Sequence, residues 1–222
     1  MRNLFYPPNC LLCQRPLVRT EQALCAHCLP LLPRTNFHLQ QDNPADQLFF
    51  GRIPVHKAAA FCFFEKGNHF RSLIHAFKYH HQRNVAYELG RLYAQEIAPS
   101  KWHDGIDLLI PVPLYWYKKW KRGYNQSEWI ARGIASVWNI PVATENLHKK
   151  RNNKTQTRKS LYDRYLNATS TYALKQDTGL IGKHILLVDD VLTSGATLEA
   201  CASPLLTIPD IKISILTLAF AE

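Results

Sequence analysis

The stretch "ILLVDDVLTSGATLEA" (residues 185–200) decides how the rest of the chain is interpreted. Its first four residues are apolar, and they predict a strand that is buried on both faces of a parallel sheet. Asp189 and Asp190 follow at the carboxyl end of that strand, where open parallel sheets place their ligands. The turn that follows leads into a predicted helix from about Gly195 to Leu206.

The turn from Thr193 to Thr197 has the composition of an anion site. Backbone N–H groups at a helix N-terminus point outward and favour a phosphate, and Gly195 lets the backbone come close. Ionised aspartates would repel a phosphate that they touched, so we expect Asp189 and Asp190 to face another part of the ligand. Carboxylates accept hydrogen bonds from a vicinal diol and can also help hold a hydrated Mg²⁺. A diol one sugar away from a phosphate describes a phosphoribosyl group.

Competing interpretations of this stretch are weaker. A P-loop would require the pattern GxxxxGK[ST], which is absent from the sequence. Receiver domains carry an acidic pair after their first strand, and too few residues remain after Asp190 to build the rest of that fold. A simple helix cap at Thr193 or Ser194 stays open as an alternative, although capping does not explain the acidic pair.

The remaining apolar segments alternate between strand and helix patterns. Strands are predicted at 57–64, 106–114, 140–147, 183–188 and 212–220, and further helices at 69–80, 82–98, 123–138 and 157–168. Strands that alternate with helices form βαβ units. The predicted fold class is therefore α/β, with a mostly parallel sheet flanked by helices.

Four of the six cysteines form two CxxC pairs near the N-terminus. These are Cys10 with Cys13 and Cys25 with Cys28, and eleven residues separate the pairs. Each CxxC turn can deliver two thiolates to one side of a Zn²⁺ ion, and two turns complete a tetrahedral shell. Two disulfides, or a redox-active pair, remain the alternatives. Four protein ligands leave no open position for chemistry, so the predicted zinc site is structural.

The positive charge is concentrated in one part of the chain. The net charge is +10, and residues 115–165 hold twelve Lys or Arg against three acids. The stretch "LYWYKKWKRGYNQSEW" (114–129) interleaves these cations with Tyr and Trp. Basic grooves with aromatic platforms bind single-stranded nucleic acid. A basic surface that faces a polyanion and a merely solvated face both remain open.

Targeting signals are not evident in the sequence. No apolar run approaches the roughly 20 residues that cross a bilayer, and "MRNLFYPPNC" (1–10) lacks the pattern of a secretory signal. We therefore expect a cytoplasmic protein without membrane insertion.

Several motifs resemble those of known families. "LLVDDVLTSGAT" (186–197) resembles the phosphoribosyl-pyrophosphate (PRPP) binding motif of type I phosphoribosyltransferases. "IPVPLYWYKKWKRGYNQSEWIA" (110–131) resembles the PVPL…RGxNQ signature of the ComF/GntX family. Residues 149–167 resemble that family's R…TxxQ…L…R..N block, and the double CxxC pattern fits as well. Together these similarities extend over nearly the whole chain.

The resemblance implies a fold, a division of the chain and a set of site residues. The fold would be that of a type I phosphoribosyltransferase with a small zinc module, divided into a module at 1–33, a connector at 34–56 and a phosphoribosyltransferase-like domain at 57–222. The tandem acids Asp189 and Asp190 would contact the ribose 2′ and 3′ hydroxyls. The 5-phosphate would lie against Thr193, Ser194, Gly195, Ala196 and Thr197, and a loop for the pyrophosphate would comprise Pro111, Val112 and Pro113. Basic and mobile loops would supply Lys118, Arg122, Lys154 and Arg158, and Mg²⁺ would accompany PRPP.

The resemblance also implies a cellular role. The ComF family is associated with natural competence, so the implied partners are single-stranded DNA, a competence helicase and a recombination mediator. The family resembles amidophosphoribosyltransferases without their glutaminase domain. The alternative is therefore a genuine phosphoribosyltransferase with an unknown acceptor, and no residue of this sequence identifies a catalytic group.

Overall fold

The computed structural model describes residues 9–21, 23–65, 69–79, 82–150, 171–175 and 179–221. Its strands are β1 (Lys57–Phe63), β2 (Leu108–Pro111), β3 (Leu147–Lys149), β4 (Tyr172–Leu174), β5 (His184–Leu192) and β6 (Lys212–Phe220). Its α-helices are α1 (Pro44–Gln47), α2 (His69–Tyr79), α3 (Arg83–Ile97), α4 (Trp116–Arg122), α5 (Gln126–Trp138) and α7 (Ala196–Leu205). Short 3₁₀ helices lie at Leu29–Leu31, Phe37–Leu39 and Ala98–Ser100.

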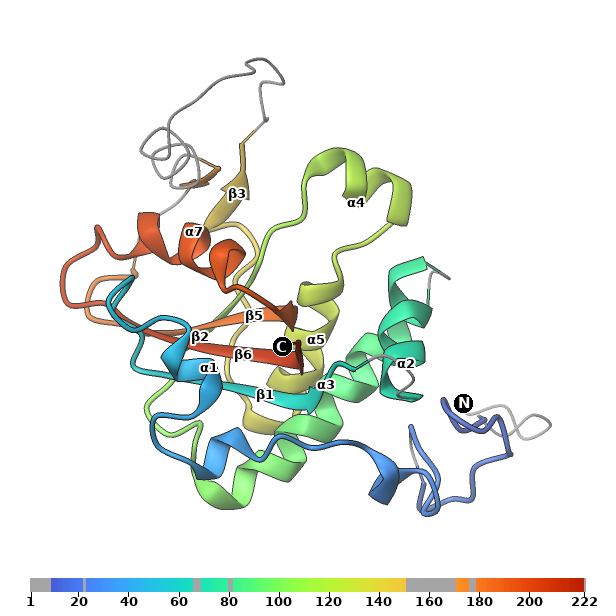
Figure 1. Cartoon of the computed structure of the whole chain (residues 1–222). Coiled ribbons are helices and arrows are strands. Elements are labelled where there is room, and N and C mark those ends of the chain that lie inside the picture. Colours follow the sequence, from blue (N-terminus) through green and yellow to red (C-terminus); the bar gives the residue numbers. More distant parts are fainter. Residues whose placement is uncertain are drawn as a thin grey trace.

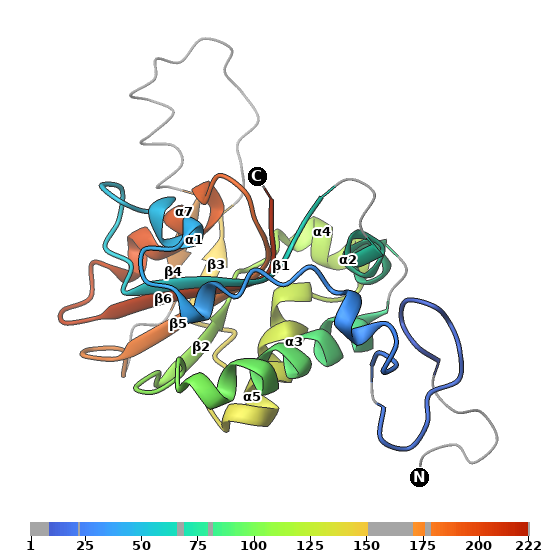
Figure 2. The same ribbon diagram turned by 60° about the horizontal axis from the view of Figure 1, so that its bottom comes forward.

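A parallel sheet forms the centre of the structure (Figure 1). The strand order is β1-β6-β5-β2, and each neighbouring pair is parallel. Helices α3 and α5 cover one face of this sheet, and α1 and α7 lie on the other (Figure 2). The residues 185–188 of β5 are buried, as their uninterrupted apolar pattern predicts for a strand covered on both faces. The predicted α/β class with a mostly parallel sheet is confirmed.

Two glycines let the helices α3 and α5 touch at their backbones. A Cβ atom on Gly133 would lie 2.1 Å from the carbonyl oxygen of Tyr87, and one on Gly90 would lie 2.4 Å from that of Ile130. No larger residue fits at this distance, so the two glycines fix how closely the helices cross. The indole N–H of Trp138 also donates a hydrogen bond to the carbonyl of Ala94, at 3.0 Å. This packing sets the position of the first turn of α5 below the sheet.

The predicted strand at 140–147 is wrong in its extent. Residue Val142 makes only an isolated bridge with Leu109, and the next strand, β3, begins at Leu147. That strand pairs with β4 in an antiparallel hairpin, separate from the main sheet. Pro141 has no N–H for a ladder, so this segment reaches the sheet edge without extending along it.

Other segments also differ from the sequence patterns. Strand β5 is longer than predicted and continues through both aspartates to Leu192, because Asp189 pairs with Thr217 of β6. Helix α4 was not predicted, since its residues have no apolar periodicity. The predicted helix at 157–168 lies outside the described residues. Within the described part of the chain, no helix is long and apolar enough to cross a membrane.

The stretch from residue 34 to residue 56 packs onto the sheet. Its side chains Phe37, Ala45 and Phe49 belong to the same buried core as the strands. Asn43 caps α1 and also donates to the carbonyl of Ala58 at 3.0 Å, while the Asp46 carboxylate accepts from the N–H of Ala58 at 2.6 Å. These bonds attach α1 to β1. The division of the chain into module, connector and domain stays a prediction.

Candidate functional site

The carboxylates of Asp189 and Asp190 lie at the carboxyl end of β5, and side chains from two helices contact them. The Asp189 carboxylate accepts a hydrogen bond from the Ser127 hydroxyl at 2.9 Å and another from the N–H of Asp190 at 2.9 Å. The Asp190 carboxylate lies 3.0 Å from the ammonium group of Lys78. Ser127 belongs to the first turn of α5, and Lys78 to the last turn of α2. The position at the carboxyl edge is the one that the sequence predicts.

The two carboxylates have different partners, and the charge of Asp189 is disfavoured. Burial and the neighbouring charge of Asp190 raise the pKa of Asp189 to about 7, although hydrogen bonds from Asp190 and Ser127 oppose the shift. Asp190 is 16% exposed at its side chain and is balanced by Lys78. The pair therefore consists of one carboxylate paired with a lysine and one whose protonated form is favoured by its surroundings.

The turn from residue 193 to residue 197 is open to solvent. Thr193, Ser194 and Thr197 are exposed, while Gly195 is buried with φ of +74° at the N-cap of α7. The N–H groups of Ser194 and Gly195 donate no hydrogen bond within the described part of the chain. Arg52 contacts this turn from the outside and donates to the carbonyl of Ser194 at 2.8 Å. Free N–H groups at the start of a helix form a suitable site for an oxyanion.

The residues predicted to hold pyrophosphate are engaged in the fold. Pro111 and Pro113 have no N–H, and the N–H of Val112 donates to the carbonyl of Val188 at 2.9 Å. The carbonyl of Val112 accepts a hydrogen bond from the Asn125 side chain at 3.0 Å. Backbone donors for a pyrophosphate would thus have to come from outside these three residues. Their assignment to a pyrophosphate loop stays a prediction.

The predicted basic residues are distributed over two regions. Lys118 lies in α4, and Arg122 ends that helix partly buried. Lys154 and Arg158 lie outside the described residues, so their proposed contact with a ligand also stays a prediction.

Helix α4 projects from the body of the molecule (Figure 1) and exposes three aromatic side chains. Trp116, Tyr117 and Trp120 are 58%, 52% and 77% exposed. The rings of Tyr117 and Trp120 are stacked, with centroids 6.3 Å apart. By contrast, Tyr124 is buried, and its hydroxyl donates to the carbonyl of Phe77. The aromatic stretch is therefore divided between core and surface.

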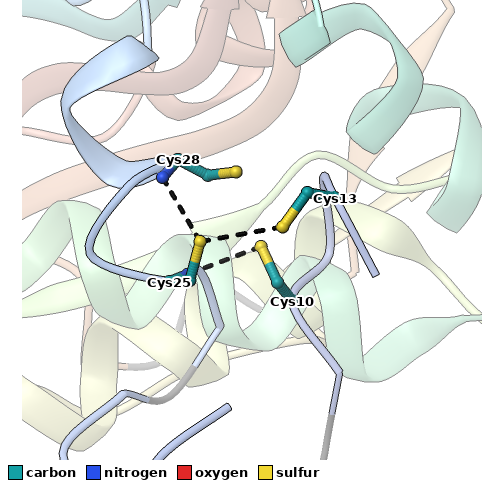
Figure 3. Close-up of side chains that lie close together, drawn as sticks. All are labelled: Cys10, Cys13, Cys25 and Cys28. Carbon is teal, nitrogen blue, oxygen red and sulfur yellow. Dashed lines mark hydrogen bonds between the residues drawn. The ribbon is translucent and has the colours of Figure 1, made fainter. Parts of the chain in front are cut away.

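Four cysteines converge in the N-terminal part of the chain (Figure 3). The sulfur atoms of Cys10, Cys13, Cys25 and Cys28 all lie within 4.8 Å of one another. Four thiolates around one Zn²⁺ at about 2.3 Å would lie about 3.8 Å apart, and the sulfurs of Cys13 and Cys25 are separated by 3.7 Å. The N–H of Cys25 donates to Cys10 at 3.4 Å, and that of Cys28 donates to Cys25 at 3.3 Å. The cluster fits a structural zinc ion.

The four thiols differ in how readily they lose their protons when no metal ion is bound. Although burial opposes the shift, hydrogen bonds from the Cys28 backbone and the Arg15 side chain lower the pKa of Cys25 to about 6. Burial and the neighbouring thiols raise the pKa of Cys28 to about 12. Because like charges suppress one another at this distance, four thiolates require a metal ion between them.

The side chain of Arg34 links the N-terminal cluster to α3. The Arg34 guanidinium lies 2.7 Å from the Glu96 carboxylate of α3 and donates to the carbonyl of Leu29 at 2.8 Å. Nearby, a groove of about 370 Å³ is lined by residues of the N-terminal segment and by Arg91 and Leu92 of α3.

Three polar residues of the site were missed from the sequence. Ser127 follows the NQ of the RGxNQ motif directly and could have been found there. Lys78 lies in a helix that was recognised only by its apolar spacing, and Arg52 lies in the stretch interpreted as a connector. Both reach the site through tertiary contacts, so no local signal identified them.

Comparisons with known proteins identify homologues. The chain is 27% identical over 220 residues to the DNA utilization protein YhgH of Escherichia coli (strain K12), a match covering 91% of this chain and 92% of that protein. It is 25% identical over 214 residues to the YhgH protein of Salmonella typhimurium. It is 30% identical over 131 residues to competence protein F of Haemophilus influenzae, covering 57% of each chain. The resemblance to ComF-type proteins is confirmed, while no protein-family model matches the chain.

One solved structure with a similar arrangement is the glutamine PRPP amidotransferase from B. subtilis complexed with ADP and GMP. The TM-score is 0.42 at 22% sequence identity, and the match covers 61% of this chain. The chain spans only about a quarter of that protein's length, 26%.

We predict one zinc ion per chain, held by the four cysteines. Cys13→Ser should lower the zinc content well below one equivalent, since an exposed ligand is lost without a change in core packing. Cys62→Ser is the control, because that thiol is buried in β1 away from the cluster and its variant should keep its zinc. Metal analysis of the proteins, purified in reductant, measures both. A Cys13→Ser protein with a full, equally tight zinc equivalent would contradict the site.

We also predict that Asp189 makes the stability of the protein depend on pH. The native state keeps a proton on Asp189 up to about pH 7, whereas the unfolded chain loses it near pH 4, so the free energy of unfolding falls as pH rises through this window. Relative to the parent, Asp189→Asn should gain up to about 1.4 kcal/mol per pH unit between these values.

Urea unfolding at pH 4.5, 6 and 7.5 tests this. Asp107→Asn is the control, because the backbone N–H of His184 and the charge of Lys183 lower the pKa of Asp107, so its difference from the parent should stay constant between pH 4.5 and 7.5. Its stabilising effect is present at higher pH and is lost as pH falls below about 4. A difference between Asp189→Asn and the parent that does not change with pH would refute the assignment.

Proposed function

We propose that this protein binds PRPP or a related phosphoribosyl ligand and acts in the use of incoming DNA, as in natural competence. The single observation that carries the proposal is the juxtaposition of an acidic pair with an open, glycine-capped turn. The pair has the acceptors for a ribose diol, and the turn has free donors for a 5-phosphate. The names of the homologues, DNA utilization protein and competence protein F, support the cellular part.

The residues favour Mg²⁺ as a companion of the ligand rather than as a resident ion. Asp190 is already paired with Lys78, and the pKa of Asp189 lies near 7. Such a pair is a poor cage for a hard cation, which prefers several ionised oxygen ligands. Mg²⁺ would therefore enter as a counter-ion of the pyrophosphate, and the aspartates would accept hydrogen bonds from the diol in exchange for some of their present ones.

Calorimetric titration of Mg²⁺–PRPP and of ribose 5-phosphate into the zinc-loaded protein tests the pocket. The parent should bind both, and Asp189→Asn combined with Asp190→Asn should weaken binding by about tenfold, because amides replace the two carboxylates that accept hydrogen bonds from the diol. Asp107→Asn is the matched control, since it removes a carboxylate from the opposite edge of the sheet, before β2. Equal affinity of parent and double variant, or no binding by either, would refute the pocket.

The alternative is a genuine phosphoribosyltransferase with an unknown acceptor. In that case the protein would release pyrophosphate from PRPP only when an acceptor is added. Binding without acceptor-dependent release favours a ligand-sensing or DNA-handling role.

A second proposed activity is the binding of single-stranded DNA along α4. The three exposed rings favour it, because each stacked base contributes about 1–3 kcal/mol and stacking tolerates any base. The surrounding sequence supplies Lys118, Lys119 and Lys121, whose positive charge suits a phosphate backbone. A competence helicase and a recombination mediator are the protein partners that such a role would require.

We predict that Trp116→Ala combined with Trp120→Ala weakens binding of an unstructured oligonucleotide by about tenfold or more. Ile181→Ala is the control, because the exposure of this side chain, 68%, lies between those of the two tryptophans and it is not part of α4. Fluorescence anisotropy over a range of salt concentrations measures affinity, and neutralising the three lysines should reduce its salt dependence. A double variant with the parental affinity would exclude α4 as the platform.

A further inference from the structure

We propose that Arg52 is a positioning residue that holds the turn at 193–195 in an oxyanion-binding conformation. The inference rests on the proposed function in one respect: it takes the 5-phosphate of a phosphoribosyl ligand as the oxyanion. Arg52 lies 142 residues before Ser194 in the sequence, in the stretch expected to be a connector.

Arg52 makes two contacts that join this stretch to the start of α7, and a third within the stretch itself. One guanidinium nitrogen donates to the carbonyl of Ser194 at 2.8 Å and to that of Leu48 at 2.9 Å. The other pairs with the carboxylate of Glu199, in the first turn of α7. Arg52 therefore binds both the turn, through a hydrogen bond, and the helix that follows it, through an ion pair.

The bond to Ser194 fixes the direction of a donor. The carbonyl of Ser194 and the N–H of Gly195 belong to one peptide group, and in a trans peptide they point in opposite directions. Because Arg52 holds the carbonyl on its own side, the N–H of Gly195 faces the other side of the turn. That N–H donates to no other group in the described residues, so it stays available to an oxyanion.

Phe49 supports the same turn by packing. A Cβ atom on Gly195 would lie 2.9 Å from the ring of Phe49, which is itself 1% exposed. The ring and the arginine belong to one turn, since the N–H of Arg52 donates to the carbonyl of Phe49 at 3.0 Å. This turn follows α1, which Asn43 and Asp46 attach to β1. A continuous series of contacts thus connects the sheet, through α1 and the turn after it, to residues 193–195.

The pairing with Glu199 has a separate electrostatic effect. A carboxylate in the first turn of α7 would repel a phosphate bound at that helix N-terminus, and Arg52 neutralises it. The two effects can be separated by substitution. In a protein that lacks Arg52, removing the Glu199 charge as well would abolish the repulsion of the phosphate. It would not restore the hydrogen bond to the Ser194 carbonyl.

The first test needs no ligand and uses backbone ¹⁵N relaxation of the zinc-loaded protein. In the parent, residues 193–195 should have order parameters near about 0.85, and in Arg52→Met they should fall below about 0.6. Arg132→Met is the matched control, because Arg132 forms a comparable pair with Glu128 at 2.8 Å on α5. An equally rigid turn in Arg52→Met would overturn the proposal.

The second test titrates ribose 5-phosphate into the same proteins. Arg52→Met should bind roughly tenfold more weakly, and Arg52→Lys should recover part of the loss, because one charged donor is retained. Glu199→Gln should bind at least as well as the parent, and the double variant Arg52→Met with Glu199→Gln should stay weak. Full recovery in that double variant would overturn the positioning role in favour of charge compensation alone.

The two tests keep this inference distinct from the proposed function. A parent protein that fails to bind ribose 5-phosphate refutes the phosphoribosyl pocket, and the relaxation data alone then decide whether Arg52 holds the turn. Zinc content and thermal melting confirm that each variant is folded. If Arg52→Met does not fold, Arg52→Lys provides the comparison, with intermediate mobility of the turn expected and parental rigidity contradicting the proposal.

Discussion

Two carboxylates side by side at the end of a buried strand impose the constraint on which the site depends. The two charges repel each other, and burial together with the charge of Asp190 disfavours the ionised form of Asp189. Two helices each supply one side chain that stabilises these carboxylates. Ser127 of α5 donates a hydrogen bond to Asp189, and Lys78 of α2 forms an ion pair with Asp190. Ser127 can reach the strand because α5 lies against α3 at the two glycine contacts and packs under the sheet. The packing of α5 against α3 therefore determines whether Asp189 has its hydrogen-bond donor.

Much of this arrangement could be predicted from the sequence, because its signals are local. The apolar run before Asp189 predicted a buried strand, the glycine after Ser194 predicted a turn, and the two CxxC pairs predicted a metal-binding cluster. The three-dimensional partners could not be predicted in the same way. Lys78 and Arg52 are ordinary surface residues in their own segments, and only the tertiary fold brings them to β5 and α7. Helix α4 escaped prediction because its aromatic residues face solvent and so follow no burial pattern.

The cysteine cluster also brings like charges close together, but here a metal ion rather than a side chain would balance them. Four thiols within 4.8 Å cannot all ionise together unless a cation lies between them, whereas two carboxylates can be balanced by side chains of the protein. Arg34 then connects this cluster to α3 through Leu29 and Glu96.

The partners of the acidic pair also determine where affinity for a ligand would come from. A diol that binds Asp189 or Asp190 exchanges existing hydrogen bonds for new ones, so its net gain is small. In the described part of the chain the N–H groups of Ser194 and Gly195 have no protein partners to lose, so a phosphate bound there displaces only water. We infer a division of roles in which the turn supplies most of the binding energy and the carboxylates supply the discrimination. A ligand with a phosphate but no diol would then still bind, and one with a diol but no phosphate would not.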